Sequence, residues 1–356
     1  MVTYEKWGEH GGKDVFLYKL ENESGMKVEV TNFGCGVTSV QYHGIDVALG
    51  FDNLEAYEAQ TCYLGVTAGR SANRIRDARF TLLGTEFQVS GNIGKHHLHG
   101  GFKGFDKVLW DVDNVDPKGN AVRFSYLSRD GEEGYPGNLT VKVTYSLDEE
   151  CGLRIGYEAV TDQATIVNLT NHTYFNLSGH NSGTVENQQV KIHSNAFLEV
   201  DSESIPTGNI VPVDGTPFDF RDFHKIGERI EDDDIQMKYG GGYDHNWILD
   251  GGQTGDLKPA GINGQTDDWM KLAAEAWDEK TGIRLQVYTT MPGVQFYSGN
   301  SLNERSRGKD GAIYGRRCGF CLETQFYPDA IHHPEFPQPV LLPGQTYRHR
   351  TVYKLK

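Results

Sequence analysis

Two side chains in this sequence have the chemical types that proton transfer requires. His172 lies at the centre of the segment IVNLTNHTYFNL (residues 166–177), and Glu323 lies in the apolar segment GFCLETQF (residues 319–326). An imidazole and a carboxylate in one site can protonate one atom of a substrate while they deprotonate another. A glutamate in a strand apolar enough to be buried is rare without a functional reason. The pair is therefore the first candidate for general acid–base chemistry.

The segment that carries His172 alternates as a strand with two different faces would. The polar face would present Asn168, Thr170, His172, Tyr174 and Asn176, and the apolar face Val167, Leu169, Phe175 and Leu177. A polar row on so apolar a strand is costly unless it faces water or a ligand, so we expect it to form the floor of a polar cleft. This segment alone fits an exposed sheet face with a surface histidine equally well.

Further polar candidates lie on predicted strands or where loops join them. Asn73 and Arg74 end the segment GVTAGRSANRI, whose small residues give an arginine room to point inward, although a surface salt bridge is the commoner arrangement. Asp244 follows the glycines of YGGGYDHNWIL, where a turn-capping aspartate is at least as common as a cleft residue. Gln295 shares one face of a strictly alternating strand with Tyr297.

His97 and His99 raise the alternative of a metal site. In KHHLHGGFKGF they would share a strand face, as in the HxH motif of cupins. Such a site needs another imidazole and a carboxylate nearby, and Asp106 lies beyond a Gly-Gly turn. Cys318 and Cys321 form a CxxC motif, but a zinc site would need a second pair. We therefore expect no metal, a hydrogen-bonding His99 and buried cysteines.

The remaining sequence predicts an all-β scaffold for these residues. The chain has 43 glycines and 11% aromatic residues, a composition that favours strands joined by tight turns. Alternating runs in residues 15–42 predict a meander of three strands, and Asp-Gly and Pro-Gly turns in residues 109–160 predict further hairpins. No linker or internal repeat divides the chain, so we expect residues 1–356 to form a single domain.

Few and short helices are expected. Residues 51–60 would form a short helix with Asp52 or Asn53 as its N-cap, and residues 221–230 would form a second one. The acidic cluster at residues 231–234 is most simply a solvated edge.

Charge and motif content exclude several classes of function. The chain has 49 acidic and 34 basic side chains and a formal charge of −15, which repels nucleic acid and anionic lipid. We expect no nucleic-acid or membrane partner, and the lack of a signal peptide or membrane span predicts a cytoplasmic protein. Five scattered cysteines do not form a disulfide framework. GxSxG, P-loop and Rossmann glycine motifs are absent.

Six motifs together resemble those of the aldose 1-epimerases, also called galactose mutarotases. They are NRI (73–75), LHGG (98–101), NHTYFNL (171–177), YDHN (243–246), PGVQFYSGN (292–300) and ETQFYPDA (323–330). They recur in the family's order along nearly the whole chain. The resemblance implies a large antiparallel β-sandwich, the galactose mutarotase-like supersandwich, with few short helices. It also implies a reaction without cofactor or metal that interconverts the α and β anomers of hexoses such as glucose and galactose.

The same resemblance assigns roles to individual residues. His172 would be the general acid and Glu323 the general base. The residues that would hold sugar hydroxyls are Asn73, Arg74, His99, Asp244 and Gln295. We expect nearby carboxylates to raise the pKa of His172 above 6.5. A monomer or weak dimer is expected, and the long segment 251–269 has no assigned effect on substrate choice.

Two rival functions use the same residues differently. A non-catalytic sugar-binding protein on the same sandwich would keep Arg74 and Asp244 but would need neither His172 nor Glu323, and both are present. A metal-dependent, cupin-like enzyme would depend on the HxH pair of residues 97–99. The presence of both proton-transfer residues favours the epimerase.

Overall fold

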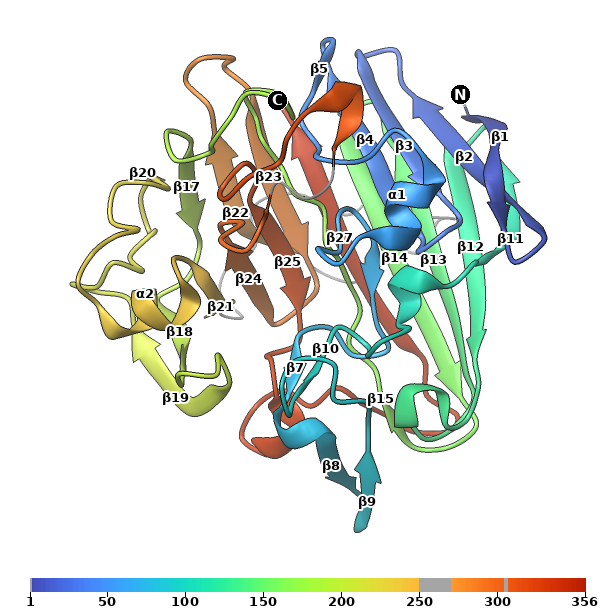
Figure 1. The fold of residues 1–356 in the computed structure, drawn as a ribbon, viewed down its shortest axis with the longest axis vertical. Coiled ribbons are helices and arrows are strands. Elements are labelled where there is room, and N and C mark those ends of the chain that lie inside the picture. The colour runs from blue at the N-terminus through green and yellow to red at the C-terminus, as the bar shows by residue number, and fades with distance from the viewer. Residues whose placement is uncertain (1, 250–269, 304–306) are drawn as a thin grey trace.

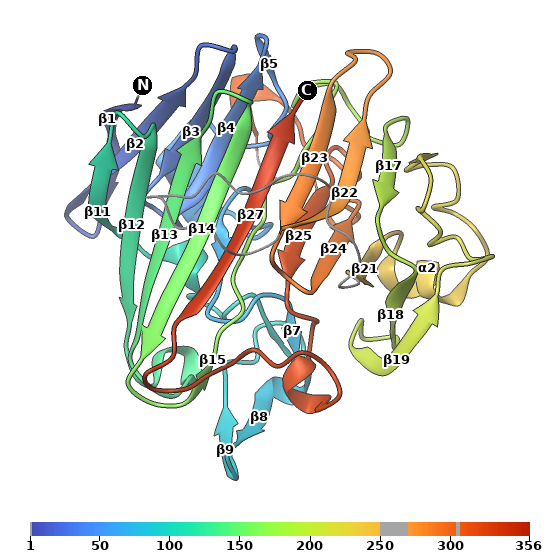
Figure 2. The same cartoon turned by 180° about the vertical axis from the view of Figure 1, so that it is seen from behind.

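The fold consists of two β layers packed face to face (Figures 1 and 2). The structure is a computed structural model that describes residues 2–249, 270–303 and 307–356. Among these residues, one layer is a nine-stranded antiparallel sheet. Its strands, in spatial order, are β11 (Asp111–Asp116), β12 (Ala121–Ser128), β13 (Leu139–Leu147), β14 (Gly152–Thr161), β27 (Tyr347–Leu355), β23 (Arg284–Thr289), β22 (Lys271–Trp277), β17 (Gln189–Ile192) and β20 (His224–Lys225).

The facing layer is made of two five-stranded antiparallel sheets. The N-terminal one contains β1 (Val2–His10), β2 (Lys13–Glu21), β3 (Met26–Thr31), β4 (Gly36–Tyr42) and β5 (Ile45–Asp46) in sequence order. The other has the spatial order β19 (Pro206–Pro212), β18 (Ala196–Val200), β21 (Asp244–Ile248), β24 (Gly293–Tyr297) and β25 (Cys321–Gln325). In Figure 1 these two sheets lie in front of the nine-stranded sheet.

Short strands connect the layers and cover the end of the sandwich. They pair as β6 (Thr67–Ala68) with β16 (Thr170–Asn171), β7 (Arg74–Ile75) with β10 (His97–Leu98), β8 (Arg79–Leu82) with β9 (Thr85–Gln88), and β15 (Thr165–Ile166) with β26 (Val340–Leu341). Single 3₁₀ turns are η1 (Arg76–Ala78), η2 (Phe105–Lys107), η3 (Glu132–Gly134), η5 (Lys309–Gly311) and η6 (Ala330–His332).

Period-two alternation explains why these segments form strands. In β14 the side chains of Leu153, Ile155, Tyr157 and Ala159 are buried, while those between them are more exposed. They belong to one hydrophobic core that also takes Val28 from β3 and Phe296 from β24, so both layers contribute to it. Full burial of each large apolar side chain is worth about 1.5–3 kcal/mol. The predicted all-β sandwich is confirmed, and so is the meander at residues 15–42, to which β1 adds an edge strand.

One of the two expected helices is present. Residues 51–60 contain α1 (Leu54–Ala59), and its N-cap is Asn53, whose side-chain oxygen accepts a hydrogen bond from the Ala56 N–H at 2.9 Å. The prediction of a helix at residues 221–230 is wrong, because this segment forms β20 and turns. Its Ile226 and Gly227 N–H groups donate to carbonyl oxygens of residues 188 and 186, so pairing with a distant segment replaces the helical bonds.

A helix that the sequence did not indicate follows the acidic cluster. Asp234 is the N-cap of α2 (Ile235–Gly240) and accepts hydrogen bonds from the N–H groups of Gln236 and Met237. Residues 231–233 of the cluster are exposed, as expected, and Glu231 pairs with Arg317 at 2.6 Å. Among the described residues, no helix is long and apolar enough to cross a membrane.

Residues 166–177 do not form the continuous strand that their alternation predicts. Only β15 and β16 are strands, and the segment pairs first with β26, then with β6, and then with Phe320. Both predicted faces are buried. Asn168 donates side-chain hydrogen bonds to the carbonyl oxygens of residues 72 and 326, and Asn176 donates to those of residues 183 and 318. The two asparagines of the predicted polar row therefore hold neighbouring backbone in place instead of facing a cleft.

Candidate active site

Three neighbouring strands, β21, β24 and β25, build the floor of the site. Antiparallel register places Asn246, Gln295 and Glu323 in one row, and Asp244, Tyr297 and Cys321 in the next. Residues directly opposite one another share a sheet face. The residues between them on these strands, such as Trp247, Phe296 and Leu322, point to the opposite face and are buried in the core.

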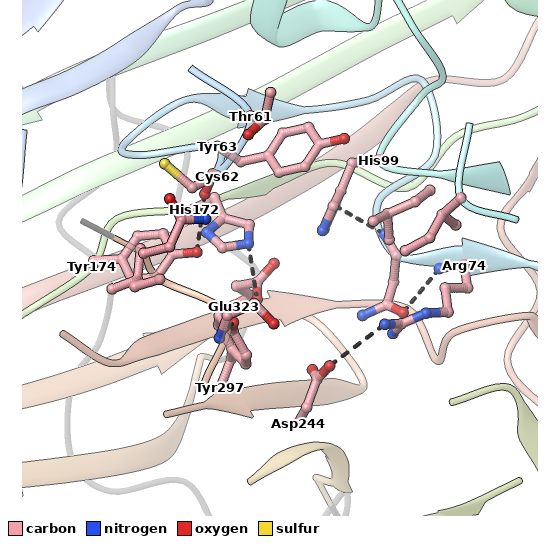
Figure 3. Close-up of a pocket in the computed structure, with 16 residues that line it drawn as sticks. Thr61, Cys62, Tyr63, Arg74, His99, His172, Tyr174, Asp244, Tyr297 and Glu323 are labelled. Atoms are coloured by element: carbon pink, nitrogen blue, oxygen red, sulfur yellow. Dashed lines mark hydrogen bonds and ion pairs between the residues drawn. The ribbon is translucent and has the colours of Figure 1, made fainter. Parts of the chain in front are cut away.

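His172 faces Glu323 across the top of this floor (Figure 3). The distance from His172 Nε2 to Glu323 Oε1 is 3.6 Å, and the two residues are only 4% and 2% exposed. The backbone of His172 is fixed on both sides, because its N–H donates to the Val66 carbonyl oxygen and its carbonyl accepts from the Gly65 N–H. Glu323 Oε2 has no hydrogen-bond partner among the described residues. A buried carboxylate oxygen is thus left available to a ligand.

Aromatic rings surround the His172 imidazole. The ring centroids of Tyr174, Tyr63 and Tyr297 lie 5.0, 5.9 and 6.4 Å from that of His172. His99 packs edge-on against it at 5.1 Å. Such packing holds the ring in one orientation, with one nitrogen toward Glu323.

His99 enters the site from a tight turn. It has a left-handed backbone conformation (φ 49°), and its Nδ1 accepts a hydrogen bond from the Asn73 N–H at 3.2 Å. The next residue must be glycine, because a Cβ on Gly100 would lie 1.7 Å from the Gly69 carbonyl oxygen. His97 does not share its face, contrary to the HxH prediction. Its ring contacts the Ser90 carbonyl oxygen and the Tyr135 hydroxyl behind the site.

Arg74, Asp244 and Gln295 form a connected row at the other side of the cavity. An Arg74 guanidinium nitrogen lies 3.6 Å from Asp244 Oδ2, and Gln295 Nε2 donates to Asp244 Oδ1 at 2.7 Å. Asn73 accepts the Arg74 N–H through its side-chain oxygen at 2.8 Å. Gln295 is 2% exposed and reaches Asp244, not the cavity wall. Its predicted contact with a sugar stays a prediction.

The site contains a cavity of about 230 Å³. Of the residues selected from the sequence, it brings together Asn73, Arg74, His99, His172, Asp244 and Glu323. Tyr174, on the face of residues 166–177 that was expected to form a cleft floor, also lines it. The rest of its wall was not assigned to a site from the sequence: Thr61, Cys62, Tyr63, Ile93, Leu98, Tyr297, Ser301, Leu302 and Asn303. For Tyr297 the shared face with Gln295 was a usable signal. The segment 61–63 has no periodic pattern and gave none. The segment 251–269 lies outside the described residues.

Burial dominates the electrostatics of the site. It raises the pKa of Glu323 well above its ordinary value, and Asp244 adds to this effect while Arg74 opposes it. Burial lowers the pKa of His172 to about 4, against the opposing effect of its own carbonyl oxygen. The expectation that neighbouring carboxylates raise the His172 pKa above 6.5 is therefore wrong. Loss of hydration outweighs the nearby charge.

The site also contains a set of side chains that could be considered for metal binding. Among the described residues, possible ligand atoms of His99, His172 and Glu323 lie within 4.8 Å of one another. A neutral imidazole binds a metal through its unprotonated nitrogen. Because His99 Nδ1 accepts the Asn73 N–H, the ring proton lies on Nε2. This tautomer makes Nε2 a donor to a substrate oxygen and not a metal ligand.

The all-β sandwich thus holds a buried imidazole–carboxylate pair in a polar cavity. The family model described as aldose 1-epimerase matches residues 17–354. A galactose mutarotase of Rattus norvegicus is 42% identical over 99% of this chain and 98% of its own. An aldose 1-epimerase of Escherichia coli is 38% identical over 96% of each chain. The crystal structure of a galactose 1-epimerase from Lactobacillus acidophilus, 30% identical, matches 100% of this chain and 98% of its own with a TM-score of 0.85. This chain belongs to the aldose 1-epimerase family.

Proposed function

We propose that this aldose 1-epimerase opens and closes a sugar ring with His172 as general acid and Glu323 as general base. The enzyme interconverts the α and β anomers of an aldose. The observation that carries the residue assignment is the 3.6 Å approach of His172 Nε2 to Glu323 Oε1 inside a buried cavity. A carboxylate oxygen, Glu323 Oε2, which has no hydrogen-bond partner among the residues that the structure describes, lies beside it. Such a pair can act on two neighbouring oxygens of one substrate.

Ring opening requires two proton transfers, one from the sugar to the enzyme and one from the enzyme to the sugar. Glu323 takes the proton of the anomeric hydroxyl while His172 Nε2–H protonates the ring oxygen. The bond from C1 to the ring oxygen then breaks, and C1 becomes the carbonyl carbon of the open aldehyde. After rotation about the C1–C2 bond, the two residues run the same transfers in reverse and close the other anomer. Each transfer to or from a positioned group contributes roughly 10²–10⁴-fold in rate.

The reacting form of the pair carries one proton, located on His172. Burial alone would place this proton on Glu323, because it disfavours both charges. Two features support the charged arrangement once a sugar fills the cavity. Arg74 stabilises the carboxylate, and the tyrosine rings around His172 present π faces to the imidazolium. Sugar hydroxyl groups that donate to Glu323 Oε2 would favour the ionised carboxyl further.

The sugar is held by groups that do not move protons. Arg74 and Asp244 offer a charged donor and a charged acceptor on the same wall, a combination suited to adjacent hydroxyl groups. His99 offers Nε2–H to an oxygen near the reacting centre. Gln295 acts through Asp244, which it holds by a hydrogen bond. Residues from β7, β10, β21, β24 and β25, which are far apart in the sequence, meet at this cavity, which supports a single domain that works as one unit.

Hexoses such as galactose and glucose are the proposed substrates. The test is polarimetry of freshly dissolved α-D-galactose and α-D-glucose with and without the protein. The optical rotation should reach the same equilibrium value faster in the presence of enzyme, because a catalyst changes the rate and not the anomer ratio. A rate equal to the spontaneous one with both sugars would contradict the proposed substrate class.

A further inference from the structure

Asn92 binds both ends of the tight turn that carries His99. The turn runs from Leu98 to Gly101, whose N–H donates to the Leu98 carbonyl oxygen at 3.1 Å. The Asn92 side-chain oxygen accepts the Leu98 N–H at 2.7 Å. Its side-chain nitrogen donates to the carbonyl oxygens of Leu98 and Gly101 at 2.9 and 3.0 Å. One amide thus fixes the two ends of a turn whose second residue is His99.

The partners of Asn92 determine which way its amide points. A backbone N–H can only donate and a carbonyl oxygen can only accept. The oxygen of Asn92 must therefore face the Leu98 N–H, and the nitrogen must use both of its hydrogens on the two carbonyl groups. An ionised aspartate at this position would accept the first bond but could donate neither of the other two.

The turn needs this support because His99 is an unfavourable residue at its centre. His99 and Gly100 both have positive φ, 49° and 95°, as the central residues of a type I′ turn do. Glycine adopts such a conformation freely, whereas a residue with a side chain is held there against its steric preference for negative φ. Conformations of this kind persist where the surrounding structure determines them. The three bonds from Asn92 supply that determination at both ends of the turn.

The position of the turn decides how the His99 ring meets its other partners. His99 Nδ1 accepts the Asn73 N–H at 3.2 Å, and the His99 N–H donates to the Asn73 carbonyl oxygen at 3.2 Å. The first of these bonds leaves the ring proton on Nε2. A displaced turn would break it and turn the donor away from the sugar. Asn92 does not line the cavity, so its effect on the sugar would pass through the turn.

His97 anchors the segment that carries Asn92. Its Nδ1 lies 2.7 Å from the Ser90 carbonyl oxygen, which can only accept, so Nδ1 carries the proton and Nε2 accepts from the Tyr135 hydroxyl at 2.6 Å. Burial lowers the pKa of His97 to about 4, so the ring is neutral at pH 7. A histidine that the sequence offered as a possible metal ligand thus fixes the backbone two residues before Asn92.

We propose that Asn92 is a positioning residue that sets the place of His99 in the cavity and thereby the affinity for the sugar. The proposal rests on the proposed function, in which His99 offers its Nε2–H to a sugar oxygen.

The first test compares Asn92→Ala with wild type by initial-rate polarimetry of α-D-galactose. We expect KM to rise about threefold to tenfold, the effect of losing the His99 hydrogen bond to the sugar, with kcat nearly unchanged. Asn92→Asp keeps the volume and should raise KM in the same direction, so it replaces the alanine variant if that variant does not fold. Asn120→Ala is the matched control, because Asn120 also donates to two carbonyl oxygens, those of residues 21 and 147, and does not line the cavity. It should keep wild-type KM.

A double-mutant cycle separates positioning from a general loss of structure. His99→Asn removes the imidazole and introduces a residue that tolerates a left-handed backbone. If Asn92 acts through His99, adding Asn92→Ala to this variant should change KM little, so the two increases should not add. A merely structural Asn92 would raise KM by the same factor in both backgrounds.

The tautomer of His99 gives a direct readout. In protein with ¹⁵N-labelled histidine at neutral pH, the His99 signals are assigned by their loss in His99→Asn. We expect a protonated Nε2 in wild type and a mixture of tautomers in Asn92→Ala, because the Asn73 N–H no longer holds Nδ1. An unchanged KM in the folded Asn92 variants, additive effects in the cycle, or an unchanged His99 tautomer would each overturn the proposal. Failure of the proposed function looks different, because the wild-type enzyme itself would then not accelerate mutarotation.

Discussion

Replacing Glu323 by glutamine tests the proton-transfer pair with little change of volume. At an effective dielectric constant of about 20, charges 3.6 Å apart attract by about 4.6 kcal/mol. Without this attraction, burial holds the pKa of His172 at about 4. At pH 7 roughly one His172 ring in a thousand is then charged. We expect Glu323→Gln to lower kcat about a thousandfold, which agrees with the roughly 10²–10⁴-fold contribution of one general base.

Polarimetric initial rates, corrected for spontaneous mutarotation, measure this loss. Glu275→Gln is the matched control, because Glu275 pairs with His193 at 3.0 Å on β22 and does not line the cavity. Thermal unfolding curves of the variant and the wild type show whether the variant is folded. The pKa of Glu323 is raised on folding, so its contribution favours the folded state less as pH rises above 4.5. The neutral amide should therefore leave the protein at least as stable at pH 7. A folded Glu323→Gln variant with more than a tenth of wild-type kcat would refute the assignment.

Four further outcomes can be measured. Gln295→Leu should raise KM roughly 10- to 100-fold, because Asp244 loses a hydrogen bond to its charged carboxylate; an unchanged KM in initial-rate assays would remove Gln295 from sugar binding. Exhaustive chelation should leave kcat unchanged, and recovery of lost activity on adding zinc or iron would contradict the donor role of His99. The profile of kcat/KM against pH should be bell-shaped. Its acid limb should lie near pH 4, where His172 becomes charged beside an already protonated Glu323, and its alkaline limb where the pair loses its single proton. A flat profile from acid to alkaline pH would exclude His172 and Glu323 as the proton-transfer pair. The free energy of unfolding should fall as pH drops from about 6.5 to 4, because four buried histidines with lowered pKa values become charged only when the protein unfolds. If unfolding at pH 5.5 took up no protons, this explanation would be wrong. These histidines are His97, His99, His172 and His245.

Regular alternation was enough to predict the scaffold. Strands such as β13 and β14 have one buried face along their whole length, so period two in the sequence corresponds to burial in the structure. The same alternation in residues 166–177 misled, because this segment pairs with three partners in turn and is buried on both sides. Its asparagines are polar because they bond to distant carbonyl groups. Local pattern cannot separate a polar residue that faces a ligand from one that holds another loop.

The same distinction, between a polar residue that faces the cavity and one that holds another residue, applies to the predicted site residues. Glu323 could be selected because a carboxylate on an apolar strand has few structural explanations, and the structure places it in the cavity. Gln295 has the same apparent qualification, yet its amide is used by Asp244 across the strand pair. The tautomer of His99 was beyond the sequence altogether. It depends on a backbone N–H of residue 73, which reaches the ring nitrogen Nδ1 only through the folded arrangement. This contact behind the ring leaves the proton on Nε2, so it decides which nitrogen presents an N–H to the cavity, and it is as much a part of the site as the groups that line the cavity.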